Sequence, residues 1–215
     1  PIFLRSIHIQ TPIVWIGLSW IGGALFLAPA ISKQEAKNQG LMVDILFWAT
    51  LAVVAGGIAG NYFGLTNAID KHWFWFGNQG LSYIELGRAW QIGFFGGLLL
   101  WSGLVFRALW PGEGQFKKAV KDFFTGNIYL EHLLWAATIN IALLYAAGMV
   151  PLTGIEKSFS ITDFWRWWVV HLWVEQSFEF FTVAVSAYLL METGLVSRVL
   201  AERAVYFELI LIFLG

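Results

Sequence analysis

The sequence predicts an all-α protein, a polytopic bundle of transmembrane helices, on two observations. Of the 215 residues, 58% are hydrophobic and only 13% are charged, which is more apolar surface than a soluble core of this size needs. The apolar residues are also gathered into runs that reach or exceed the roughly 20 residues required to cross a bilayer. The chain is therefore expected to lie in a membrane, with the lipid bilayer as its solvent.

Five full spans and one shorter one follow each other within a single domain, residues 1–215. The last apolar run has only about ten residues, so we expect its helix to be cut short and the chain to be a fragment of a larger subunit. The expected spans are near 6–30, 42–66, 81–110, 127–151, 162–191 and 204–215.

The connections between spans are polar and set the expected orientation. Assigning alternate connections to opposite sides places eight of the 13 basic residues on one side, which by the positive-inside rule is the cytoplasmic one. The connection 111–126 is read as a charged cytoplasmic loop, and the aromatic segment 70–77 as a short helix or loop on the outer membrane surface. The eight residues are Lys33, Lys37, Arg107, Lys117, Lys118, Lys121, Arg198 and Arg203.

Charge and cysteine content exclude several classes of function. The net charge is −1 and no basic cluster is typical of a nucleic-acid partner, so none is expected. The chain has no cysteine, which removes disulfides, thiolate ligands and iron–sulfur clusters. Any metal must therefore be held by histidine, carboxylates or a cofactor ring.

The span 162–191 carries ionisable residues in its middle. A charge at that depth costs at least about 2.5 kcal/mol, so such residues usually mark an ion, proton or metal site. His171, Glu175 and Glu179 are four residues apart and form one stripe on an α-helix. Mixed nitrogen and oxygen donors suit iron, with zinc or copper next. A structural His–Glu hydrogen bond and a proton relay remain open as alternatives.

Two further residues lie toward the same outer side as His171. His8 is near the outer end of the first span, where a lone histidine is more often an interfacial residue than a ligand. Glu85 either pairs along a helix with Arg88, three residues later, or binds a hard cation. Together these positions indicate a site in the outer half of the bundle.

Other polar and small residues are expected to serve packing. The small residues of 56–60 let helix backbones approach closely. Glu131 and His132 are shallow enough to reach interfacial water, while Thr138 and Asn140 lie deeper and are expected to hydrogen-bond to neighbouring helices.

The segment Trp165–Glu175, with Glu179, resembles the catalytic helix of the nitric oxide reductases of the haem-copper oxidase superfamily. The segments His8–Ala30 and Gly77–Gln91 resemble the quinol-dependent branch in particular. The resemblance covers essentially the whole chain in order. It implies an integral protein of a prokaryotic inner membrane that couples two NO molecules to nitrous oxide, with a quinol as possible electron donor.

The resemblance also implies cofactors and residue roles. The reaction would take place at a high-spin haem b and a non-haem iron, with His171 and Glu175 as iron ligands and Glu179 tied to proton delivery. His8 would be an axial ligand of a low-spin haem b, and Glu85 would bind a calcium ion. The remaining haem and iron ligands would come from further helices of the same polypeptide.

One departure from the reductases adjoins the ligand glutamate. Gln176 and Ser177 stand where the family usually has glycine and a bulky residue. This favours, as an alternative, the divergent relatives proposed to be NO dismutases, which would yield dinitrogen and dioxygen. A proton or ion transporter without haem is the second alternative. A dioxygen-reducing oxidase is disfavoured, because oxidases use copper and a nearby tyrosine where this stripe has a glutamate.

Overall fold

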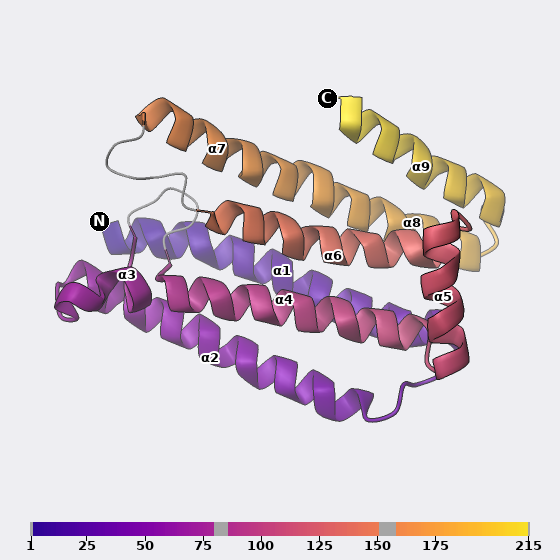
Figure 1. The fold of residues 1–215 in the computed structure, drawn as a ribbon, viewed down its shortest axis with the longest axis horizontal. Coiled ribbons are helices and arrows are strands. Elements are labelled where there is room, and N and C mark those ends of the chain that lie inside the picture. The colour runs from indigo at the N-terminus through magenta and orange to yellow at the C-terminus, as the bar shows by residue number, and fades with distance from the viewer. Residues whose placement is uncertain (1, 80–85, 151–157, 215) are drawn as a thin grey trace.

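The computed structural model describes residues 2–79, 86–150 and 158–214, which fold almost entirely into helices (Figure 1). The long helices lie along one axis with alternating direction, and α5 crosses one end of the bundle (Figure 1). Within these ranges the only extended pairing is an isolated bridge between Asn78 and Leu86. The elements are α1 (Ile2–Ser32), α2 (Gln39–Leu65), η1 (Asp70–His72), α3 (Trp73–Phe76), α4 (Arg88–Leu109), α5 (Glu113–Thr125), α6 (Leu130–Met149), α7 (Phe159–His171), η2 (Leu172–Phe178), α8 (Glu179–Glu192) and α9 (Arg198–Leu214).

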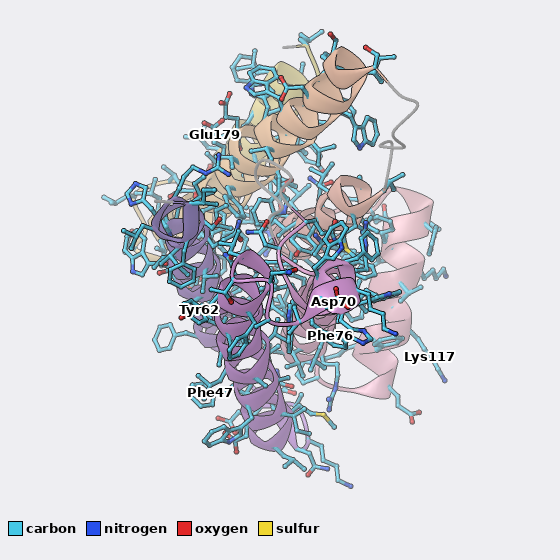
Figure 2. The ribbon with its side chains drawn as sticks, turned by 90° about the vertical axis from the view of Figure 1, so that its left-hand side faces the viewer. Phe47, Tyr62, Asp70, Phe76, Lys117 and Glu179 are labelled. Carbon is cyan, nitrogen blue, oxygen red and sulfur yellow. The ribbon has the colours of Figure 1, made fainter. Side chains whose placement is uncertain are left out.

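Helix α4 is the centre of the bundle, because it packs against α1, α2 and α6. Its Trp101, Leu104 and Val105 are fully buried. The hydroxyls of Ser102 and Thr138 join α4 to α6 at 2.9 Å, which confirms the expected interhelical hydrogen bond of Thr138. Away from α4 the apolar surface faces outward, as Phe47 does on α2 (Figure 2), and this is the surface that lipid would cover.

The small residues of α2 allow close packing, as expected. A Cβ at Gly56 would overlap the indole ring of Trp90, and one at Gly60 would collide with the carbonyl oxygen of Phe76. That same carbonyl accepts a hydrogen bond of 3.0 Å from the Trp90 indole nitrogen. Helix α3 and the start of α4 therefore sit directly on the backbone of α2.

Four of the described helices, α1, α2, α4 and α6, are long and apolar enough to cross a membrane. The expected fifth span is helical from Phe159 to Glu192, but it is divided into α7, η2 and α8, of 13, 7 and 14 residues. A helical membrane bundle is thus supported, whereas the count of five full spans is not confirmed. The segment expected as the last, shorter span forms α9, of 17 residues.

The expected start of the third span, near residue 81, lies outside the described residues. Helix α4 begins at Arg88, because Leu86 is engaged in the bridge to Asn78 and Gly87 is extended, with ψ of 150°. Leu86 and Gly87, just before Arg88, are not helical. Glu85 itself lies outside the described residues.

Arg88 contacts two other helices. Its guanidinium donates to the Met149 carbonyl at 2.5 Å and lies 5.7 Å from the ring centroid of Phe74. The side chain thus joins the end of α6 to α3, and it satisfies a carbonyl that the helix end leaves without an intrahelical partner.

The connection 111–126, expected as a charged loop, contains the amphipathic helix α5. Ala119 is buried against the bundle, and the ring of Phe123 lies 5.8 Å from that of Trp135. Three lysines in the segment favoured a loop interpretation, although the apolar residues between them have helical spacing.

Because 111–126 contains a helix and not a loop, His132 is buried. Its side chain is 3% exposed, not in contact with interfacial water as expected, because α5 covers it. The ring nitrogen Nδ1 accepts the Tyr129 N–H at 3.2 Å, and Nε2 lies 3.2 Å from the Ala119 carbonyl of α5. Its neighbour Glu131 forms an ion pair of 2.5 Å with Arg198.

The connections alternate between the two ends of the bundle, as expected. The N-terminal ends of α1, α4 and α7 lie at one end together with α3, while α5 and the link between α1 and α2 lie at the other (Figure 1). Positions near the starts of α1 and α7 are therefore at the same end of the molecule.

Candidate metal site

The segment that carries the candidate ligands is not a regular α-helix. Between α7 and α8, residues Leu172–Phe178 form seven residues of π-helix. A π-helix bonds each N–H to the carbonyl five residues earlier and holds one more residue per turn; short π segments within α-helices occur frequently at functional sites. The periodic interpretation of the sequence assumed an α-helix and missed this segment, which contains neither glycine nor proline.

His171 and Glu175 are brought together at this segment. The Nδ1 atom of His171 lies 2.9 Å from Oε2 of Glu175, and the two side chains are 36% and 61% exposed. The imidazole is stacked on the indole of Trp167, with ring centroids 5.2 Å apart and planes 8° from parallel. The predicted contact between the histidine and the glutamate is therefore present, and the stacking fixes the plane of the imidazole.

The separation of these two atoms suits a shared metal ion. Nitrogen and oxygen ligands lie about 2.1 Å from a typical transition metal, so two of them at right angles are roughly 3 Å apart. His171 Nδ1 and Glu175 Oε2 are 2.9 Å apart and accessible. Within the described residues, however, no three His, Cys, Asp or Glu residues form a group that could hold a metal. The pair fits as part of a site that needs further ligands.

Among the described residues, Glu179 does not complete a three-residue group with His171 and Glu175 that could hold a metal. It is the first residue of α8, at the other end of the π-helical segment from His171, and its side chain is exposed (Figure 2). The π-helical segment changes the register between α7 and α8, which the assumed α-helical spacing did not include.

Glu179 is near enough to Glu208 of α9 for the two negative charges to repel each other. One carboxylate oxygen of Glu208, Oε2, is buried and has no hydrogen-bond partner among the residues that the structure describes. The sequence shows Glu208 as a carboxylate within an apolar run, but not its closeness to Glu179, because that depends on the packing of α9 on α8.

His8 is separate from the pair. Its side chain is exposed on α1, and the N-terminal end of α1 lies at the same end of the bundle as the start of α7 (Figure 1). An exposed imidazole is available to a cofactor beside α1, which is compatible with its expected role. The calcium expectation for Glu85 falls on a residue outside the described ranges.

Two residues of α6 hold the π-helical segment in place. The side-chain amide of Asn140 donates to the Ser177 hydroxyl at 2.7 Å, and the Trp173 indole nitrogen donates to the Ile141 carbonyl at 2.9 Å. The expected interhelical hydrogen bond of Asn140 is thus confirmed. The Ser177 hydroxyl also donates across the π turn to the Leu172 carbonyl, at 3.4 Å.

This arrangement also defines the position of Ser177. The sequence places Ser177 two residues after Glu175, within the departure from the reductase pattern. In the structure Ser177 is fully buried and directed at α6, while the neighbouring Glu175 is exposed. Ser177 therefore acts on the pair through the backbone of η2 and not by facing it.

An apolar cavity lies beside the same segment. It is enclosed by α1, α2, α4 and α6, and Trp173 and Phe178 of η2 form part of its wall together with Trp20 and Trp101. The indole nitrogen of Trp101 is buried there, with no hydrogen-bond partner in the described part of the chain. Cavities lined by apolar side chains stay dry and accept small apolar molecules.

The fold and the donor pair define an integral-membrane helical bundle with a histidine and a glutamate placed as neighbouring ligands. The family model for cytochrome c and quinol oxidase polypeptide I matches residues 3–215, so the chain belongs to this haem-copper oxidase family. A similar protein is a nitric oxide reductase subunit of Stutzerimonas stutzeri, 24% identical over 206 residues, which are 94% of this chain and 39% of the relative. The chain spans about two fifths of the length of that curated relative.

Proposed function

We propose that this chain is part of a membrane oxidoreductase that couples two NO molecules to nitrous oxide, with His171 and Glu175 as two ligands of a non-haem iron. The observation that carries the proposal is the 2.9 Å contact between His171 Nδ1 and Glu175 Oε2 on a π-helical segment. Membership of the haem-copper oxidase family and the similarity to a nitric oxide reductase support it.

The proposal requires further groups around this pair. When bound, the non-haem iron and a neighbouring high-spin haem b supply the redox chemistry that joins the two nitrogen atoms. His8 would hold a low-spin haem b, Glu85 a calcium ion, and the remaining ligands would come from other helices of the same polypeptide. A quinol is the proposed electron donor, and a prokaryotic inner membrane is the proposed location.

The chain's own residues have distinct tasks. The Glu175 carboxylate offsets positive charge at the iron, and the Trp167 stack fixes the His171 ring. Two NO, two electrons and two protons give nitrous oxide and water, so the site needs a proton supply. Glu179, which follows the pair on the same helical stretch, is the residue we propose to deliver protons, with Glu208 as its neighbour.

Apolar access suits the proposed substrate. NO is small and nearly apolar, so it partitions into the membrane and into dry cavities. The cavity between α1, α2, α4 and α6 reaches the π-helical segment through Trp173 and Phe178. This gives NO a place to dissolve beside the buried face of the segment that carries Glu175.

An NO dismutase is the second candidate, favoured by Gln176 and Ser177. One of these two residues takes part in helix packing, because Ser177 accepts a hydrogen bond from Asn140 of α6. Such an enzyme would convert NO to dinitrogen and dioxygen without an external donor.

The test uses the full-length protein in membranes, isotopically labelled NO and mass spectrometry of the headspace, with and without a quinol. Nitrous oxide that forms only with the donor supports the reductase. Labelled dinitrogen with dioxygen, in the absence of donor, supports the dismutase. A folded protein that contains neither haem nor iron would refute both and leave the transporter alternative.

A further inference from the structure

A basic hollow lies at the end of the bundle where α5 begins. It is formed by the link between α1 and α2, the end of α4 and the first turn of α5. Its walls carry three cationic side chains and one carboxylate, together with two aromatic rings. These residues are Lys37, Arg107, Lys117, Glu113, Trp110 and Phe116.

The walls of the hollow are held by hydrogen bonds and ring contacts. The Arg107 guanidinium donates to the Lys37 carbonyl at 2.7 Å, which ties the end of α4 to the α1–α2 link. The centroid of the Phe106 ring lies 4.7 Å from that of Trp110 and 5.0 Å from that of Phe116. The charged side chains of the hollow therefore belong to elements that are packed against each other. With Glu113 opposing them, the three cations leave an excess of two positive charges.

The first turn of α5 adds to this positive potential. Helix α5 starts after Gly112, and the first N–H groups of a helix have no partner within it. The positive end of the helix dipole lies at the same point. The hollow therefore favours an anion, and a planar guanidinium with two lysines is a set that suits phosphate oxygens.

Helix α5 also has an apolar edge that its own bundle leaves uncovered. Phe116, Val120 and Phe124 are four residues apart, and Phe124 is 82% exposed. Lys117 and Lys121 flank this edge; Figure 2 shows Lys117 projecting from α5 at the margin of the molecule. An exposed apolar edge bordered by lysines is typical of a helix that lies in the membrane interface.

The orientation of α5 agrees with that location. The membrane-spanning helices run along one axis, and α5 lies across their end (Figure 1), where the plane of the membrane surface must pass. The same end carries the excess of basic residues that is expected to face anionic headgroups.

We infer that this hollow binds the headgroup phosphate of an anionic phospholipid, through Lys37, Arg107 and Lys117, with the acyl chains beside Phe124. The apolar edge next to the cations selects a lipid over a soluble anion. The inference is independent of the reaction proposed above, because no residue of the hollow belongs to the His171–Glu175 site.

The test compares lipid binding by the full-length protein in detergent, measured by native mass spectrometry. The probes are phosphatidylglycerol, phosphatidylcholine of the same chain length, and inorganic phosphate. One lysine near an anionic membrane surface contributes about fivefold in affinity. We therefore expect Lys37→Gln and Lys117→Gln each to weaken phosphatidylglycerol binding about fivefold, and the double variant roughly 25-fold.

Matched variants show whether the cations of the hollow and the apolar edge of α5 each contribute to lipid binding. Lys71→Gln removes a lysine at the opposite end of the bundle and should leave phosphatidylglycerol binding unchanged. Phe124→Ser should weaken it without altering the cations. Unchanged affinity in the double variant would overturn the inference, as would a preference for phosphatidylcholine. Equal retention of inorganic phosphate and of the lipid would show a phosphate site only and overturn the lipid assignment.

A nitroxide at position 124 of the full-length protein in nanodiscs gives a second measurement. High oxygen accessibility that responds to lipid chain length is expected for an edge in contact with acyl chains. A label shielded from both oxygen and a water-soluble relaxant would mean that protein covers this edge, which would refute the inference.

Discussion

The side-chain amide of Asn140 donates a 2.7 Å hydrogen bond to the hydroxyl of Ser177, and so joins α6 to the π-helical segment. Ser177 is fully buried and its hydroxyl also reaches the Leu172 carbonyl. The exposed pair His171 and Glu175 lies on the same helical stretch. The conformation of the donor pair thus depends on a contact made on the opposite, buried side of the helix.

Ser177→Ala should destabilise the protein and loosen the donor pair. The substitution leaves the half-buried Asn140 amide without its acceptor, and an unsatisfied polar group costs up to about 1–3 kcal/mol when it is fully buried. Thermal unfolding should show the loss, and electron paramagnetic resonance of the bound iron should show a broader distribution of environments. Ser186→Ala, at an exposed position of α8, is the control and should change neither. An iron spectrum identical to that of the unmodified protein would refute the positioning role.

Glu175→Gln should lower iron content with little effect on folding. The glutamine keeps an oxygen near His171 but loses the negative charge that offsets the metal, and the side chain it replaces is 61% exposed. Iron per protein, measured by elemental analysis, is expected to fall severalfold while the unfolding temperature of the apoprotein is retained. Glu35→Gln, on the exposed α1–α2 link, should leave the iron content intact. Full iron occupancy in Glu175→Gln would exclude this carboxylate as a ligand.

Glu179→Gln should separate proton delivery from metal binding. Because Glu179 is not grouped with His171 and Glu175 in the described part of the chain, iron content should be unchanged. The rate of NO consumption should fall by about 10²–10⁴, the usual contribution of a positioned proton donor, and its pH dependence should flatten. Loss of iron from this variant would instead make Glu179 a ligand.

Gly60→Ala should be strongly unfavourable, although alanine is normally the better helix residue. Its Cβ would collide with the Phe76 carbonyl and approach the Trp90 indole, and overpacking of this kind costs about 1–3 kcal/mol. Gly22→Ala is the matched control, since a Cβ there meets nothing within 4 Å. The control should gain about 0.5–1 kcal/mol, as expected for replacing glycine inside a helix. Thermal unfolding of both variants measures the difference, and equal behaviour would contradict the close approach of α2 to α3.

His132→Ala should release α5 from the bundle. The imidazole is buried and bridges the start of α6 to the Ala119 carbonyl, so its removal should cost about 1–3 kcal/mol. Limited proteolysis within 111–126 should become faster. Arg198→Gln, which breaks a half-exposed ion pair with Glu131, should cost less than about 1 kcal/mol. Unaltered proteolysis of His132→Ala would show that other contacts hold α5.

The sequence predicted the fold class and most helices, because long apolar runs have few alternatives in a membrane. It failed where a local irregularity decides the structure. Helix α4 begins at Arg88, after a bridge between Leu86 and Asn78 that the apolar run does not indicate. Helix α5 was not predicted, because its 13 residues are too few and too charged to be a membrane span.

The donor pair could be predicted, since His171 and Glu175 are neighbours in any helical conformation. The position of Glu179 could not, because it depends on η2, and π-helical segments have no reliable sequence pattern. The burial of Ser177 and the closeness of Glu179 to Glu208 also arise from contacts between helices, with α6 and with α9. Their roles require the tertiary structure.

The π-helical segment holds one residue more than an α-helix needs for the same turns. A π-helix has about 4.4 residues per turn, so seven of its residues turn through nearly the same angle as six α-helical ones. Removal of a single residue from Leu172–Phe178 would therefore return the stretch to an ordinary α-helix and leave α8 facing almost as it does now relative to α7. In a set of related chains, a one-residue gap at this point would mark proteins that lack the π-helical segment and still present His171 and the residues of α8 on their present faces.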